Sequence, residues 1–303
     1  MVQRVKIDSV LGPGIKIARG NYSKIKGCEV KNSQCGVHVT SAQPTILMNT
    51  FNNNYENGIL TETVKGKRCD ANILFNKIEK NKNNGILCQG ANNHTQIRRN
   101  LKICNNTMAG IKAIDGAVLS IVGNTIMLNF GQGILLVEST YAHVEQNFIS
   151  QNYKANLAFG GAASSDTVII RNVIREGRAE GIFIIESGFA WIVRNEIIDN
   201  ADGIVTYDAT PFISGNSIEH NQRSGVTCCG CSFPKIEKNQ IFGNAQSGIN
   251  FRDQSRALTE NNSIYSNFYQ FSARSFSKAD VKNMKNNNKI EGDVEVCSNC
   301  TIF

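Results

Sequence analysis

The chain has 303 residues, of which 41% are hydrophobic, and a formal net charge of +7 at pH 7. No apolar run approaches the length of a membrane span, and the charged residues 1–8 are unlike a secretory signal. The modest charge, with no aromatic residues interleaved among the basic ones, argues against nucleic acid as a partner. We therefore expect a cytoplasmic protein that binds neither membranes nor nucleic acid.

The main regularity is a Gly followed by Ile or Val that returns every 22 to 27 residues. Asn156 and Leu157 fill one slot where the Gly is missing. A period in this range indicates stacked supersecondary units, none of which buries its apolar face alone. The pairs begin at Gly14, Gly36, Gly58, Gly85, Gly110, Gly133, Gly181, Gly203, Gly225 and Gly248.

The amino-terminal stretch 2–7 has the pattern of a strand, and no room is left for a capping helix before Gly14. A solenoid without a cap exposes unpaired strand groups at its end. We therefore predict that a short irregular segment or a partner protein covers this edge.

Each repeat also contains an Asn, an aliphatic residue two positions later and a second Asn five positions later, as in Asn76, Ile78 and Asn81. Another aliphatic residue stands three positions before the first Asn, as at Ile73. Together with the Gly pair this gives three short apolar runs, too brief for helices. Asn suits tight corners, and amides stacked at equal positions can bond from coil to coil. Alternation predicts these interior pairs: Ile86 with Cys88, Ile134 with Leu136, Ile182 with Ile184, and Val226 with Cys228.

Two insertions lengthen the repeat, one at residues 64–69 and one at residues 160–166. Loops added to a solenoid project from one face and often bind ligands. The first insertion is basic, and we predict Lys65, Lys67 and Arg68 as binding residues.

The period fades after Phe271. We predict a right-handed parallel β-helix over residues 1–270, and an imperfect last coil with a carboxy-terminal cap over residues 271–303. The fold class is thus all-β, a single solenoid of about 12 coils with 22 to 27 residues per coil.

The coils resemble the parallel β-helix repeat superfamily, and in particular the right-handed β-helix region of F-box-only proteins. Bacterial periplasmic copper-maturation proteins and carbohydrate-active β-helix enzymes are also similar. Three stretches carry the resemblance, WIVRNEIIDNADGIVTYDAT, PFISGNSIEHNQRSGVTCCG and PKIEKNQIFGNAQSGINFRD. The F-box resemblance implies a substrate-recognition module of a ubiquitin ligase, although the chain has no F-box-like segment before the first coil and no zinc module after the last.

Acidic residues recur five positions after the Gly of several pairs. Paired carboxylates about 5 Å apart are what a retaining glycoside hydrolase uses. If the chain is an enzyme, these acids predict a carbohydrate-active one, namely a lyase, hydrolase or epimerase. The alternative is that the turn after this strand favours acids. The candidates are Asp115, Glu138, Glu186 and Asp208, with Asp253 in the same column.

Basic residues recur immediately before the first ladder Asn, and they form a second set of predicted binding residues. They suit an acidic protein surface such as a cytoskeletal polymer, or a solvated face. They are Arg99, Arg171, Arg194 and Lys238, with Arg98 beside Arg99.

Two short cysteine clusters have metal-ligand spacing but lie about three coils apart, so we rank a shared zinc site low. They are Cys228, Cys229 and Cys231, and Cys297 with Cys300. The four His residues occupy unrelated repeat positions, and we expect neither a His-based triad nor a cofactor. The sequence therefore favours a non-enzymatic scaffold in a larger cytosolic assembly, cytoskeletal or ciliary, which binds other proteins along a β-helix face or at the amino-terminal coil.

Overall fold

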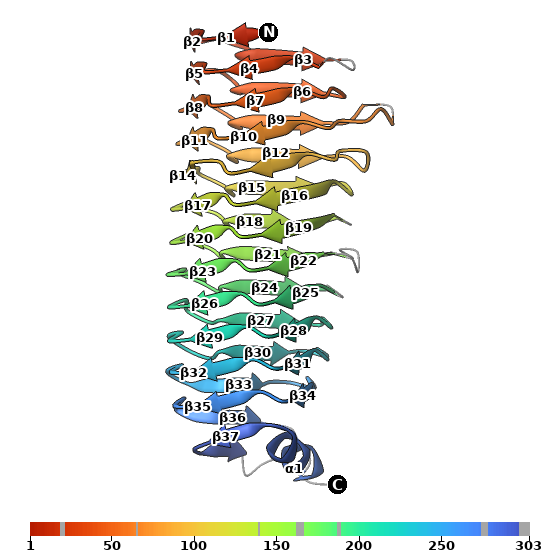
Figure 1. Ribbon diagram of the computed structural model, residues 1–303, viewed down its shortest axis with the longest axis vertical. Coiled ribbons are helices and arrows are strands. Elements are labelled where there is room, and N and C mark those ends of the chain that lie inside the picture. The colour runs from red at the N-terminus through yellow and green to blue at the C-terminus, as the bar shows by residue number, and fades with distance from the viewer. Residues whose placement is uncertain are drawn as a thin grey trace. The chain divides into compact units, whose positions relative to one another are not determined.

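The computed structural model consists almost entirely of short parallel strands (Figure 1). It describes residues 1–18, 22–64, 66–138, 140–161, 167–186, 189–273 and 278–296. Two compact units divide the chain, Met1–Lys154 and Ala155–Phe303. Within each unit the chain passes in turn through three parallel sheets, here called A, B and C, so that each coil adds one strand to each sheet.

In the first unit, sheet A consists of β1 (Val2–Gln3), β4 (Lys24–Lys26), β7 (Thr45–Leu47), β10 (Asn72–Leu74), β13 (Gln96–Arg98), β16 (Val118–Val122) and β19 (Tyr141–Glu145). Sheet B consists of β2 (Lys6–Asp8), β5 (Glu29–Lys31), β8 (Thr50–Asn52), β11 (Lys77–Glu79), β14 (Lys102–Cys104), β17 (Thr125–Met127) and β20 (Phe148–Ser150). Sheet C consists of β3 (Ile15–Ala18), β6 (Val37–Thr40), β9 (Ile59–Glu62), β12 (Ile86–Gln89), β15 (Ile111–Ile114) and β18 (Ile134–Leu136).

In the second unit, sheet A consists of β22 (Val168–Ile170), β25 (Trp191–Val193), β28 (Phe212–Ser214), β31 (Lys235–Glu237) and β34 (Leu258–Glu260). Sheet B consists of β23 (Val173–Arg175), β26 (Glu196–Ile198), β29 (Ser217–Glu219), β32 (Gln240–Phe242), β35 (Ser263–Tyr265) and β37 (Lys289–Glu291). Sheet C consists of β21 (Leu157–Gly160), β24 (Ile182–Ile185), β27 (Ile204–Tyr207), β30 (Val226–Cys229), β33 (Ser247–Phe251), β36 (Tyr269–Ala273) and β38 (Val294–Val296).

The two units together hold about twelve turns, so the predicted right-handed β-solenoid is confirmed. Helix α1 (Lys278–Asn287) lies beside β34 and β37 in the stretch predicted as a cap. No helix among the described residues has the length and apolar character that crossing a membrane requires.

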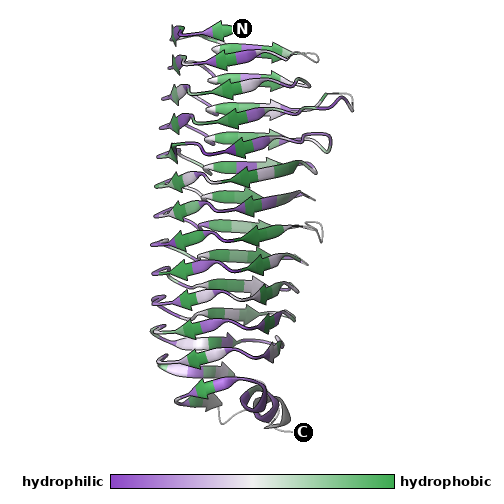
Figure 2. Cartoon of the chain, in the orientation of Figure 1, coloured by the Kyte–Doolittle hydropathy of each residue, from purple (hydrophilic) through white to green (hydrophobic). Residues whose placement is uncertain are grey.

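The core of each unit is a set of aliphatic stacks. Ile73, Ile97 and Ile121 lie opposite one another on neighbouring strands of sheet A, and all three are fully buried. Figure 2 shows apolar residues gathered on the strands, with hydrophilic residues at the corners. Complete burial of one such side chain contributes about 1.5–3 kcal/mol. The predicted interior residues are all confirmed: Ile86, Cys88, Ile134, Leu136, Ile182, Ile184, Val226 and Cys228 have no exposed surface.

The repeated Gly is required by close packing between coils. A Cβ built on Gly110 would lie 2.7 Å from the Gly133 carbonyl oxygen and 2.8 Å from Asn129 Nδ2. Such contacts are shorter than real Cβ atoms tolerate. Only Gly, which has no side chain, therefore fits at this position, where the ladder Asn of the next coil enters the core.

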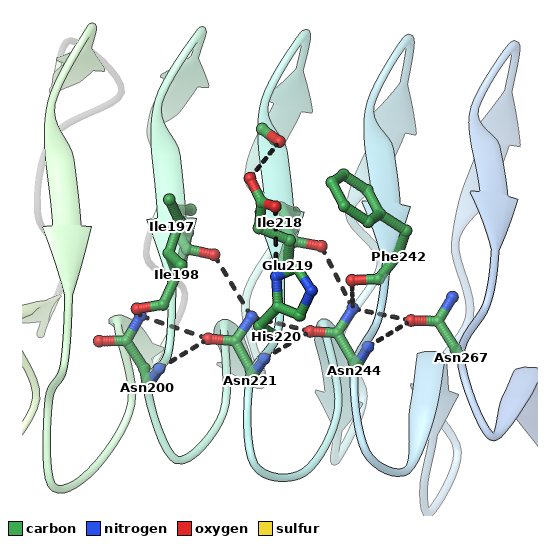
Figure 3. Close-up of polar contacts among 11 residues, drawn as sticks. Ile197, Ile198, Asn200, Ile218, Glu219, His220, Asn221, Phe242, Asn244 and Asn267 are labelled. Carbon is green, nitrogen blue, oxygen red and sulfur yellow. Dashed lines mark hydrogen bonds and ion pairs between the residues drawn. The ribbon is translucent and has the colours of Figure 1, made fainter.

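The predicted coil-to-coil bonding of Asn is confirmed (Figure 3). Asn221 Nδ2 donates to Asn244 Oδ1 at 2.8 Å, and the same oxygen accepts the backbone N–H of Asn221 at 3.1 Å. Buried amides thereby satisfy both each other and the backbone, which would otherwise be costly to bury. Equivalent ladders run through Asn76, Asn100, Asn124 and Asn147 in the first unit and through Asn195, Asn216, Asn239 and Asn262 in the second.

The repeat that lacks its Gly has exchanged two residues. Asn156 stands in the Gly position, and Gly177 stands where the ladder Asn belongs. Asn156 Nδ2 donates to Asn200 Oδ1 at 2.9 Å and to the Arg175 carbonyl at 3.1 Å. A Cβ on Gly177 would lie 2.7 Å from Asn156 Nδ2. The Asn156 side chain therefore fills the ladder position from the other side of the corner.

Candidate functional site

One cluster of ionisable residues lies on the outer face of sheet C in the first unit. The register of β3, β6, β9 and β12 places Lys16 beside His38, and Thr40 beside Glu62, which in turn neighbours Gln89. Because alternate residues of a strand point outward, these side chains share one face while Ile and Val fill the core. Residues from four successive coils thus meet at one place.

The Glu62 carboxylate is held through both of its oxygens. Oε1 lies 2.8 Å from His38 Nε2 and accepts a hydrogen bond from Thr40 Oγ1 at 3.1 Å. Oε2 accepts a hydrogen bond from Gln89 Nε2 at 3.2 Å. The His38 and Glu62 side chains are only 19% and 21% exposed, so the pair is partly shielded from solvent. This carboxylate orients the imidazole.

The first insertion forms one wall of the site. The connection between β9 and β10 projects beyond those of neighbouring coils (Figure 1). Ser41 anchors it, because its hydroxyl accepts the Val64 N–H at 2.9 Å and donates to the Lys67 carbonyl at 3.3 Å. Arg68 of the same loop pairs with Asp70 at 2.8 Å, whereas Lys65 lies outside the described residues.

A cavity of about 520 Å³ results, lined by Lys16, Ala18, His38, Thr40, Ser41, Glu62, Val64 and Lys67. Its volume is in the range of sites that bind small ligands. Lys16 and Lys67 are exposed and have no ion-pair partner among the described residues. Two lysines and one carboxylate thus line the cavity, and the resulting positive charge favours an anionic ligand.

This arrangement suits proton transfer next to a carboxylate. If His38 Nε2–H donates to Glu62, the neutral ring keeps Nδ1 as its unprotonated, basic nitrogen. Lys16 and Lys67 provide positive charge for a substrate carboxylate and for the charge that develops on it. A base that is oriented by a carboxylate and flanked by cations has the groups needed to remove a proton α to a carboxylate.

The acidic column lies elsewhere, at the exposed corner that follows sheet C. All five acids have positive φ, between 51° and 58°, and Gly90 and Gly230 occupy the same position in other coils. Asp208 Oδ1 accepts the Cys231 N–H at 2.7 Å, and Asp253 Oδ2 accepts the Gly230 N–H at 2.9 Å. The left-handed corner thus accounts for Asp115, Glu138, Glu186, Asp208 and Asp253. Catalysis by these acids stays a prediction without a supporting contact.

The second set of predicted basic residues lies at or beside one corner of the coil. Arg99, Arg171, Arg194 and Lys238 all occupy the left-handed corner between sheets A and B, in two different units. Lys238 Nζ lies 3.2 Å from Glu237 Oε1. Arg98 points outward from sheet A beside Arg99.

The cysteines of the first zinc cluster diverge. Cys228 is buried in the core, where burial raises its pKa to about 12, whereas Cys231 is exposed. Cys297 and Cys300 lie outside the described residues. Within the described ranges, no group of three or more His, Cys, Asp or Glu residues is arranged to hold a metal.

Sequence reasoning missed His38 because it treated the four His residues as scattered. The signal was present: Lys16 and His38 each stand two residues after a repeat Gly, and Thr40, Glu62 and Gln89 each stand four residues after one. Two other His residues also contact an acid, but they are more exposed. His143 lies 3.0 Å from Glu145, and His220 lies 3.3 Å from Glu219 (Figure 3).

A family model described as "Right handed beta helix region" matches residues 1–149 and 157–293. No curated protein matches the sequence at a significant level.

Among solved structures, the chain resembles the periplasmic alginate epimerase AlgG at 13% identity, with a TM-score of 0.67, over 80% of this chain and 70% of that one. It also resembles the A-module of the Azotobacter vinelandii mannuronan C-5 epimerase AlgE4 at 15% identity, with a TM-score of 0.57, over 93% of this chain and 85% of that one. At such low identity the likeness concerns the fold.

These matches correct the functional expectation drawn from sequence. The non-enzymatic scaffold, with its cytoskeletal or ciliary setting, is overturned because the similar structures are carbohydrate-active enzymes. The carbohydrate-active alternative accords better with them.

Proposed function

The chain belongs to the family of right-handed β-helix proteins, and on that premise we propose that it is an enzyme acting on a carboxylated polysaccharide. The observation that carries the proposal is the His38–Glu62 pair at 2.8 Å, in a cavity that Lys16 and Lys67 also line. The similarity to two epimerases of carboxylated polymers supports the choice of substrate class.

In the proposed reaction, Lys16 and Lys67 bind the carboxylate of a uronate unit. His38 removes the proton from C5, the carbon that bears this carboxylate, and the C–H electron pair moves into the carboxylate as an enolate. The two ammonium groups stabilise that charge, and Glu62 stabilises the imidazolium that forms.

The enolate has two productive outcomes. Return of a proton to the opposite face of C5 gives the epimer. Expulsion of the oxygen at C4 breaks the glycosidic bond and leaves a double bond between C4 and C5, which is the lyase outcome. Both outcomes begin with the same proton abstraction, so the first test addresses that step.

The test is incubation with polymannuronate in D2O, followed by NMR of the polymer. We expect deuterium at C5 or an unsaturated chain end, and neither on a neutral glucan. His38→Gln should lower the rate by about 10²–10⁴-fold, the usual contribution of a general base. His220→Gln is the matched control, because it removes an exposed His–Glu pair in the second unit. Full activity of His38→Gln would disprove the proposal.

Three expectations from sequence stay predictions. The F-box resemblance predicts a role in a ubiquitin ligase, which co-purification with a small ligase adaptor would test. Docking of other proteins on a coil face or at the amino-terminal coil would emerge from the same experiment. A cytoplasmic location would be tested by fractionation of cells.

A further inference from the structure

A second cavity lies on the outer face of sheet A in the first unit. It measures about 560 Å³ and is lined by Asn72, Leu74, Phe75, Arg98, Arg99, Ser120, Val122, His143 and Glu145. Register explains its composition, since Leu74, Arg98, Val122 and Glu145 occupy one outward column on successive strands. Asn72, Ser120 and His143 belong to the neighbouring outward column.

The groove carries two exposed arginines, Arg98 and Arg99. Neither Arg98 nor Arg99 has an ion-pair partner among the residues that the structure describes, and both are exposed. Other arginines do have partners, such as Arg68 with Asp70 at 2.8 Å and Arg223 with Asp202 at 2.6 Å. Two adjacent guanidinium groups present planar donor sets that match a carboxylate.

Arg99 is directed along the groove by the backbone. It stands at the left-handed corner with φ 48°, and its Cγ lies 3.4 Å from the position that a Cβ on Gly123 would take in the next coil. Gly123 therefore leaves the space over which the Arg99 stem passes. Arg194 lies over Gly215 in the same way in the second unit, which supplies a control at the equivalent position.

The rest of the groove offers hydrogen bonds and apolar contact. His143 Nε2 lies 3.0 Å from Glu145 Oε2, and Ser120 adds a hydroxyl between this pair and the arginines. Leu74, Phe75 and Val122 supply apolar surface. A row of polar groups beside an apolar strip complements a sugar, which has hydroxyl edges and C–H faces.

We propose that this groove is a non-catalytic binding site for a carboxylated glycan chain, with one carboxylate on Arg98 and Arg99 and hydroxyl groups on Ser120, His143 and Glu145. That the ligand carries a carboxylate is inferred from the two arginines alone. That the ligand is a glycan rests on the proposed function. The groove lies on sheet A and the catalytic cavity on sheet C of the same unit. A long polymer held at the groove is kept near the cavity, so its effective concentration there rises.

The test compares wild type, Arg98→Gln/Arg99→Gln and the control Arg194→Gln. Retardation in gels that contain polymannuronate measures binding without turnover. We expect the double variant to bind about tenfold to a hundredfold more weakly, and Arg194→Gln to bind like wild type. Unchanged retardation of the double variant, or equal retardation by a carboxyl-reduced polymer, would overturn the proposal. Equal melting temperatures will verify that the variants are folded, and Arg98→Lys/Arg99→Lys should bind with intermediate strength.

Kinetics separate this site from the catalytic one. The double variant should raise KM for long chains and leave kcat/KM on a uronate trisaccharide unchanged, because a short substrate cannot span both sites. A loss on the trisaccharide as well would place the arginines at the catalytic cavity and overturn the second site. If polymannuronate is bound through the arginines but never turned over, the proposed function fails while the binding site stands.

Discussion

Two sets of ionisable residues in the first unit differ in how they arise from the repeat. Asp115 and Glu138 stand at equal positions of successive coils, at a corner that Gly90 also occupies with positive φ. His38 stands at an outward position of sheet C that carries Leu60 and Leu87 in the next two coils, and Glu62 stands between Thr40 and Gln89 in the adjacent outward column. A residue type that recurs in register is explained by backbone geometry, whereas a combination that occurs once calls for another explanation.

The largest effect is expected from neutralising the cavity. Lys16→Gln/Lys67→Gln removes both lysine charges that line the cavity, and kcat/KM on polymannuronate should fall by about 10²–10³-fold or more. Lys112→Gln is the matched control, since Lys112 lies in the same outward column of sheet C but outside the cavity. Initial rates of wild type and both variants decide the matter. A similar loss for Lys112→Gln would remove the distinction between this cluster and the rest of the sheet.

A repeated residue should instead affect stability. Asn124 is buried, donates to Ile97 O at 2.9 Å and Asn147 Oδ1 at 3.0 Å, and accepts from Asn100. Asn124→Ala leaves these groups unpaired and should lower the free energy of unfolding by about 2–3 kcal/mol. Urea denaturation measures the change, with Asn92→Ala, whose side chain is exposed, as the reference. Equal stability of the two variants would contradict the structural role of the ladder.

The exchanged repeat offers a sharper version of this test. Asn156→Gly removes the amide that completes the ladder, and we expect a loss of about 1–2 kcal/mol. Gly177→Asn alone should also destabilise, because its side chain meets Asn156 Nδ2. Together they recreate the ordinary repeat, so the double variant should regain stability near that of wild type. Additive losses in the double-mutant cycle would refute the exchange.

The smallest effect concerns the thiols. Burial raises the pKa of Cys88 and of Cys228 to about 12, so both remain protonated at neutral pH and are shielded. Exposed Cys231 should be alkylated in the native protein, and the two buried thiols only after unfolding. Mass spectrometry of peptides after iodoacetamide treatment measures this order. Rapid native labelling of Cys88 would contradict the packing of sheet C.

The fold could be predicted because each coil repeats the same local rules. The Gly spacing, the Asn corners and the alternating aliphatic residues fix the register without knowledge of tertiary contacts, and Ile86 and Cys88 are buried as that register requires. The α1 helix was not foreseen, because its segment lacks the repeat.

The site was only partly accessible to prediction. Counting from the repeat Gly aligns Lys16 with His38 and Thr40 with Glu62. The acids five residues after the Gly recur in more coils and therefore gave the stronger sequence pattern. Lys67 was foreseen only as part of a basic loop. Its place at the cavity depends on the bonds of Ser41 to the loop backbone, which no period encodes.

The central claim is that chemistry resides in the unrepeated cluster and not in the repeated acids. The most direct measurement is deuterium incorporation from D2O into polymannuronate by wild type, Glu62→Gln and Asp115→Asn/Glu138→Gln. We predict that Glu62→Gln loses incorporation by about 10²-fold or more, and that the variant without the two corner acids works at the rate of wild type. Normal incorporation by Glu62→Gln, with loss in the corner variant, would contradict the account.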